Sequence, residues 1–280
     1  MRGTEQLMDG APKHRADATV AMNWQARATR ACGVLASPVP FQQRSTRSMK
    51  RIASLVVAAA TLSDPTVARA DNWPQFRGPT GQGISMETRV PVAWSARSNV
   101  LWRASIPGEG WSSPVVWGRH VFLTTATDSG ASARVIALDA RDGKVRWDHE
   151  VFRQATRKKE TRNSYATPTP ATDGKRVYAC FGDGSFVAMS FDGKVAWTNR
   201  SHPFYSQHGL GTSLLLHGGL LIMARDGSSD GPDKLVGWQK PWDQSYLLAL
   251  DAATGRERWR TPRGLTRIRS EEHTSELQSR

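Results

Sequence analysis

The 280-residue chain has only two cysteines, Cys32 and Cys180, and no apolar run as long as the roughly 20 residues that a membrane-spanning helix needs. Two cysteines cannot form the disulfide framework of a small secreted domain, and the sequence shows no Cys/His metal-binding spacing. These absences exclude disulfide-rich domains, zinc fingers and helical membrane spans.

Positive charge is abundant but dispersed. The formal net charge is +13, and basic residues are mixed with acidic ones along most of the chain. The one dense basic run, at residues 157–162, is typical of a solvated loop, although it is also compatible with contact to an anionic surface. We therefore expect no nucleic-acid binding.

Three copies of one hairpin pattern organise the sequence, at residues 137–147, 188–197 and 249–259. Each has an apolar strand end, a tight turn with glycine, and a returning strand with tryptophan. Asp-Gly and Thr-Gly pairs favour such turns because glycine adopts positive φ without a steric penalty. Trp102, Trp147, Trp197 and Trp259 are 45, 50 and 62 residues apart. A period of about 40–50 residues predicts propeller blades or solenoid units.

The pattern Ala-x-Asp-x-x-Thr-Gly-x-x-x-Trp resembles the tryptophan-docking repeat of the pyrroloquinoline-quinone (PQQ) type β-propeller family. Residues 249–259 match every fixed position, whereas the first copy has Asp142 in place of threonine. The middle copy has Ser190 in place of aspartate and is one residue shorter. The resemblance implies that each indole packs on the neighbouring blade. The docking residues are then Ala137, Asp139, Gly143, Trp147, Ala188, Gly193, Trp197, Ala249, Asp251, Thr254, Gly255 and Trp259.

The predicted fold is all-β, a partial β-propeller of about three four-stranded blades. Residues 100–104 are expected to form an N-terminal locking strand that carries Trp102. The blades follow at residues 111–147, 166–197 and 211–259, with a long polar loop at 226–244 inside the third. Residues 72–83 are rich in proline and glycine and are expected to be a loop or edge segment. A complete protein of this fold would have seven or eight blades.

The sequence divides into four segments. Residues 1–48 show no sustained periodicity and are expected to be disordered upstream sequence, with a genuine N-terminal extension as the alternative. Residues 49–70 have a basic start, an apolar stretch and a small-x-small end, which indicates a signal peptide cleaved after Ala70, with Ala68 at the other small position. Residues 71–268 are the partial propeller. Residues 269–280 resemble a translated sequencing adapter, with a polar helical tail as the alternative.

The signal peptide predicts a periplasmic or secreted protein. No cysteine follows Ala70, so we expect no lipid anchor, and we expect no transmembrane segment. The resemblance indicates the fold and says little about activity. We expect a non-enzymatic scaffold that binds a protein partner or small ligand on one face of the propeller. The alternative is a PQQ-dependent alcohol or sugar dehydrogenase. PQQ and calcium are expected only under that alternative, and the adjacent cysteines that often accompany the quinone are absent.

No residue is predicted to be catalytic. Four aspartates fall in the hairpin turns, where we expect them to stabilise the turn: Asp139, Asp142, Asp192 and Asp251. Other acidic and imidazole side chains have no calcium-loop or metal-ligand spacing: Asp183, Asp226, Asp230, His202, His208 and His217. Ser112 and Ser213 have no evident base partner, and Cys180 is expected to be a small buried residue.

Overall fold

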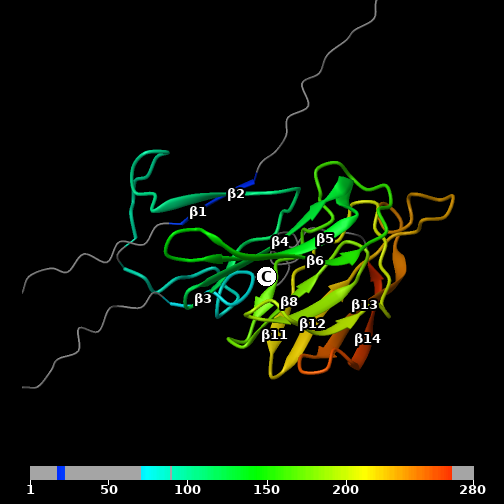
Figure 1. Ribbon diagram of the computed structural model, residues 1–280. Coiled ribbons are helices and arrows are strands. Elements are labelled where there is room, and N and C mark those ends of the chain that lie inside the picture. The colour runs from blue at the N-terminus through cyan, green and yellow to red at the C-terminus, as the bar shows by residue number, and fades with distance from the viewer. Residues whose placement is uncertain (1–17, 23–70, 89, 267–280) are drawn as a thin grey trace, which may run out of the picture. The chain divides into compact units, whose positions relative to one another are not determined.

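The computed structural model describes residues 18–22, 71–88 and 90–266, which form strands and loops (Figure 1). All belong to one compact unit that comprises residues 1–23 and 70–280. Within these ranges the only helical element is the 3₁₀ turn η1, Asp128–Gly130, and no helix is long and apolar enough to cross a bilayer. The predicted signal segment, with Ala68 and Ala70, and the predicted tail at 269–280 lie outside the described residues.

Three four-stranded antiparallel sheets follow one another along the chain, each with its strands in sequence order. They are the predicted propeller blades, and the predicted fold class is confirmed. Blade one comprises β3 (Val115–Trp117), β4 (His120–Thr127), β5 (Ser132–Asp139) and β6 (Val145–Arg153). Blade two comprises β7 (Ala171–Thr172), β8 (Arg176–Cys180), β9 (Phe186–Ser190) and β10 (Val195–Asn199). Blade three comprises β11 (Leu215–His217), β12 (Leu220–Arg225), β13 (Trp242–Asp251) and β14 (Glu257–Thr266).

The middle strands of blades one and two are covered on both faces, whereas β12 of blade three alternates buried with half-buried residues. In β4 every residue from Val121 to Ala126 is buried, whereas most of β6 is exposed or half-buried. A strand covered on both faces is a continuous apolar run instead of an alternating one, and this explains why the second and third strands are recognisable in the sequence. The polar stretch before β13 forms a loop, as predicted.

Apolar cores lie between consecutive blades. Phe122 and Val135 of blade one pack with Val177, Phe181 and Met189 of blade two. A second core joins blades two and three. Its members include Tyr178, Ala188, Leu221, Leu248 and Leu250. Blade two therefore buries apolar side chains on both of its faces, and each of these two cores is shared between neighbouring blades.

The innermost strands are shorter than the sequence predicts. Blade one was expected to begin at residue 111, but regular pairing starts only at Val115. The preceding backbone groups bond instead to the next blade: Ser113 N–H donates to Thr169 Oγ1 at 3.0 Å, and Thr169 N–H donates to Ser213 Oγ at 3.1 Å. The same hydroxyl contact thus links blade one to two and blade two to three.

A short segment before the first blade crosses all three inner strands. Residues 72–75, which we call the inner strap, were predicted to be a loop or edge. Trp73 pairs with Val116 of blade one through two backbone bonds of 2.8 Å. In blade two Thr172 N–H donates to Pro74 O at 2.8 Å, and in blade three Leu216 N–H donates to Gln75 Oε1 at 3.0 Å. The inner strap therefore connects three blades with only a few residues.

Strand β2, Trp102–Ile106, packs on blade one through a third core that includes Trp102, Ile106 and Leu138. Its edge pairs antiparallel with β1, Ala18–Met22. No strand was predicted in residues 1–48, so β1 is a difference from the sequence analysis. An unpaired edge presents free N–H and C=O groups, and a short extended segment with Thr and Val is sufficient to satisfy them.

Replacing Thr169 by valine should remove the hydroxyl acceptor while keeping the shape of the side chain. Thr169 is 2% exposed, so Ser113 N–H would be left unsatisfied, at a cost of about 1–3 kcal/mol in the free energy of unfolding. Urea denaturation measures this directly. Thr198→Val, on the exposed outer strand β10, is the matched control and should stay within about 0.5 kcal/mol. Equal losses in the two variants would contradict the role of the hydroxyl.

Candidate functional site

Each blade has two ends with different contents. Because the four strands alternate in direction, the connections between first and second strands and between third and fourth strands lie at one end. This end, which we call the hairpin end, carries the three repeat turns. The opposite end, which we call the loop end, carries the long connections at residues 107–114, 154–170, 200–214 and 226–241 and the turn at 181–185.

At the hairpin end, an indole of one strand docks on the turn of the next blade. The three indole N–H groups donate to carbonyl oxygens at equivalent turn positions: Trp102 to Ala140 (2.9 Å), Trp147 to Phe191 (2.8 Å) and Trp197 to Ala252 (3.0 Å). Trp102 belongs to β2, and the other two belong to blades one and two. The contact always runs from one unit to the next unit along the chain.

The turn glycines leave room for the indole rings. A Cβ added to Gly143 would lie 2.4 Å from Trp102, and one added to Gly255 would lie 2.4 Å from Trp197. At Gly193 the closest atom is His149 Nε2, at 2.6 Å, with Trp147 at 3.3 Å. All three glycines have positive φ, between 71° and 88°. Two independent constraints therefore favour glycine at these positions: the positive φ of the backbone and the aromatic ring packed against the Cα.

The motif alanines lie directly across the hairpin from the tryptophans. The register pairs are Ala137 with Trp147, Ala188 with Trp197, and Ala249 with Trp259. All three alanines are fully buried. A small residue at this position leaves space beside the indole in the cross-strand pair.

The motif carboxylates bind their own turns. Asp139 accepts hydrogen bonds from Arg141 N–H and from the guanidinium groups of Arg119 and Arg146. Asp251 accepts hydrogen bonds from the backbone N–H groups of Ala253 and Thr254 and from the Thr254 hydroxyl. The hydrogen bond from this hydroxyl lowers the pKa of Asp251 below its usual value.

In the middle copy Ser190 Oγ replaces the aspartate and accepts from Lys194 N–H at 3.1 Å. The other turn carboxylates also have local cationic partners. Asp142 pairs with Lys144, and Asp192 pairs with Lys194. The turn aspartates are thus committed to the turns that they stabilise.

Trp259 occupies the same position in blade three but has no following turn among the described residues. It is 37% exposed, whereas Trp102 is 8% exposed. The docking residues predicted from sequence therefore lie together at successive blade junctions, except for the indole of Trp259.

At the loop end, a cavity of about 210 Å³ lies among the connections that flank blade two. Its charged and phenolic lining comprises Arg157, Lys159, Tyr165, Asp183, Arg200 and Tyr205. Sequence reasoning treated residues 157–162 as a solvated loop and did not identify this site. The lining comes from three separate connections, and their approach is visible only in the folded chain.

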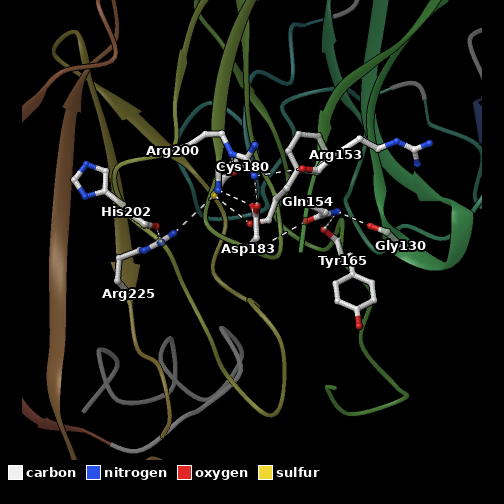
Figure 2. A network of polar contacts seen from close by, with 11 residues as sticks. Gly130, Arg153, Gln154, Tyr165, Cys180, Asp183, Arg200, His202 and Arg225 are labelled. Atoms are coloured by element: carbon white, nitrogen blue, oxygen red, sulfur yellow. Dashed lines mark hydrogen bonds and ion pairs between the residues drawn. The ribbon is translucent and has the colours of Figure 1, made fainter. Parts of the chain in front are cut away.

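A network of polar contacts joins several residues at this end (Figure 2). Gln154 donates through Nε2 to Gly130 O at 2.9 Å and accepts from Asp183 N–H at 3.4 Å. Arg200 bonds Ser185 Oγ at 3.1 Å and Asp183 Oδ2 at 3.2 Å. These bonds fix Asp183 and Arg200 in place before any ligand enters.

A second part of the network lies between blades two and three. Arg225 is 1% exposed, donates to His202 O, and lies over the rings of Phe186 and Phe204. Its Nη1 is 3.9 Å from the buried free thiol of Cys180, and burial raises the pKa of that thiol to about 12. The expectation of a buried Cys180 is confirmed, and at neutral pH its thiol is protonated and a poor nucleophile.

The remaining candidate side chains are separated from one another. Ser112 Oγ bonds the backbone of Thr124, Asp230 pairs with Arg157, and Asp226 pairs with Arg263. His208 faces Trp238, and His217 is exposed. In the ranges that the structure describes, no three His, Cys, Asp or Glu side chains cluster as metal ligands.

Comparison with known proteins gives a family match and several structural likenesses. Residues 87–280 match the family model described as outer membrane protein assembly factor BamB. Quinohemoprotein alcohol dehydrogenase from Comamonas testosteroni is 19% identical to this chain, with a TM-score of 0.49. The match covers 70% of this chain and 28% of the dehydrogenase. BamB from Moraxella catarrhalis is 19% identical, with a TM-score of 0.38, over 58% of this chain and 39% of its own.

A europium-containing methanol dehydrogenase is 15% identical, with a TM-score of 0.38, over 53% of this chain and 24% of its own. The chain therefore spans well under half the length of these solved structures. No curated protein matches it.

Gly255→Ala should destabilise the protein more than a Gly→Ala substitution at a position where nothing packs against the added methyl group. Positive φ alone costs a non-glycine residue about 1–2 kcal/mol, and the clash with Trp197 adds overpacking of about 1–3 kcal/mol. Gly219→Ala is the matched control, because its φ of 76° is close to the 72° of Gly255 and nothing lies within 4 Å of the added Cβ. Thermal denaturation of both variants gives the difference. Equal losses would show that the indole contact adds nothing.

Stability should fall as the pH drops below about 6.5, because His202 is 4% exposed and is held neutral. Burial of the imidazole lowers the pKa of His202, Glu257 opposes this effect, and Arg225 and Arg260 add to it. The unfolded chain then binds a proton near pH 6.5 that the folded chain binds only at lower pH.

The test of this pH dependence is the urea midpoint at pH 7.5 and pH 5.5. His202→Gln should reduce the difference, and His217→Gln, at an exposed position, should leave it unchanged. A midpoint that rises on acidification would contradict the role of His202.

Proposed function

We propose that this chain, which belongs to the family described as outer membrane protein assembly factor BamB, is a non-enzymatic binding scaffold that acts in the periplasm or outside the cell. The loop end is the proposed binding face, and a protein is the proposed partner. The hairpin end is occupied by contacts between blades, and its turn aspartates are bound within the turns. We therefore place the partner at the loop end.

Two exposed indoles at the loop end carry this proposal. Trp111, in the connection before blade one, is 60% exposed, and Trp238, in the long loop of blade three, is 48% exposed. Tryptophan is enriched at the centres of protein interfaces because it buries a large area with little loss of side-chain freedom. Exposed indoles on a face that the fold does not otherwise use are consistent with partner binding.

Rigid connections also support this face. Glu160 N–H donates to Gln207 O at 2.7 Å, and Asn163 Nδ2 donates to His208 O at 2.5 Å, so two long connections are bonded to each other. Gly182 N–H donates to Tyr165 O at 2.9 Å and ties in the turn of blade two. A preformed surface loses less entropy on binding than a flexible one.

The competing proposal is a PQQ-dependent dehydrogenase. It requires a quinone and calcium site outside the described residues. Purified protein titrated with PQQ and calcium, followed by a dye-linked assay of alcohol and sugar oxidation, separates the two proposals. Saturable quinone binding with turnover would overturn the scaffold.

A photo-crosslinking residue at Trp111 or Trp238 should capture the same discrete partner in the periplasm of a Gram-negative cell. Lys144, which is highly exposed at the hairpin end, provides the matched control position and should give no such adduct. Adducts would be resolved by gel electrophoresis and identified by mass spectrometry. Equal yields from both ends would contradict the assignment of the loop end.

A further inference from the structure

The loop-end cavity has an excess of positive charge. Its lining includes the cations of Arg157, Lys159 and Arg200 and one carboxylate, Asp183. Asp183 is already bound by Arg200 at 3.2 Å and by Ser185 N–H at 2.9 Å. Arg157 pairs at 2.6 Å with Asp230, which is not part of the lining. The lining therefore retains one cation, Lys159, without a carboxylate.

The ammonium group of Lys159 is held in place without an ion pair. Its Nζ donates to the carbonyl oxygens of Asn163 and Glu160 and lies 4.6 Å from the centre of the Tyr165 ring. Among the described residues no carboxylate oxygen lies within 4.0 Å of it. The side chain is half-buried, and this burial lowers the pKa of Lys159, whereas the charges of Glu109 and Glu160 oppose the shift. A partly desolvated cation gains more from an incoming anion than a fully hydrated one.

The walls of the cavity are fixed by backbone approach. A Cβ added to Gly209 would lie 2.6 Å from Asn163 Nδ2, and one added to Gly182 would lie 3.1 Å from Tyr165 Cα. Tyr165 OH donates to Arg157 O at 2.6 Å, which holds the phenol ring next to the ammonium group. The site is therefore formed before binding and does not depend on loop closure.

The volume of the cavity limits what it can hold. About 210 Å³ is less than the roughly 300–1,000 Å³ of cavities that take drug-sized ligands. The apolar part of the lining comprises three aromatic rings, from Tyr165, Phe204 and Tyr205, together with Ala155 and Pro203. These features fit one anionic group on a short aliphatic body.

We infer that this cavity binds a carboxylate on a short aliphatic chain, with Lys159 as its principal ion-pair partner. Glutarate and the side chain of a glutamate in a peptide share this chemistry. The choice of a peptide source rests on the proposed function, whereas the carboxylate preference rests on the cavity alone.

The experiment is isothermal titration calorimetry of the full chain with glutarate and with the end-blocked tripeptide Gly-Glu-Gly. The Gly-Gln-Gly analogue is the neutral control ligand. Lys159→Gln should weaken binding about tenfold or more, which is the affinity equivalent of losing one charge-assisted bond. Lys158→Gln is the matched control variant, because Lys158 is exposed, adjacent in sequence and not part of the lining. Its effect should stay within about threefold, as for a surface charge screened by salt.

Tighter binding of glutarate would identify a free organic acid as the source, and tighter binding of the tripeptide would identify a peptide side chain. Either result supports the inference. Absence of binding by both, equal binding of Gly-Gln-Gly, or equal losses in the two lysine variants would overturn it. Circular dichroism of each variant checks that the fold is retained. These failures would leave the crosslinking test of the loop end unaffected, because that test uses Trp111 and Trp238 instead of the cavity.

Discussion

The order of the blades depends on one contact, an indole that rests on the turn glycine of the next sheet. Each contact combines the burial of a large ring with a directional hydrogen bond of 2.8–3.0 Å to a turn carbonyl. Burial alone does not fix orientation, because it is non-directional, whereas the N–H bond sets both the height and the rotation of the ring. Successive blades therefore meet in the same arrangement at each junction.

The hydroxyl contacts of Thr169 and Ser213 constrain the opposite edge of each blade. Indoles hold the outer strands, and hydroxyls hold the segments that precede the inner strands. With both edges fixed, the long connections at the loop end are not needed to keep the blades together. They can differ in length and composition, and in this chain they form the cavity around Lys159.

The sequence was sufficient for features that depend on neighbours in the chain. Asp142-Gly143 and Asp192-Gly193 marked the turns, and apolar runs marked the doubly covered strands. Features that depend on distant residues were not predictable. The hydroxyl of Thr169 serves a backbone group 56 residues away, and Arg157 pairs with Asp230 over 73 residues. A single sequence contains no signal for such pairs, and β1 was missed because only an unpaired partner edge gives it a reason to form.

The inner strap has a consequence for the order of folding. Each blade is built from contiguous residues, so its hairpins can close with a small loss of chain entropy. The bond from Leu216 N–H to Gln75 Oε1 joins residues 141 positions apart, and it requires that blade three already be present beside the other two. The inner strap is therefore expected to become protected from solvent exchange only after all three blades have assembled, which makes it a late kinetic marker of the native arrangement.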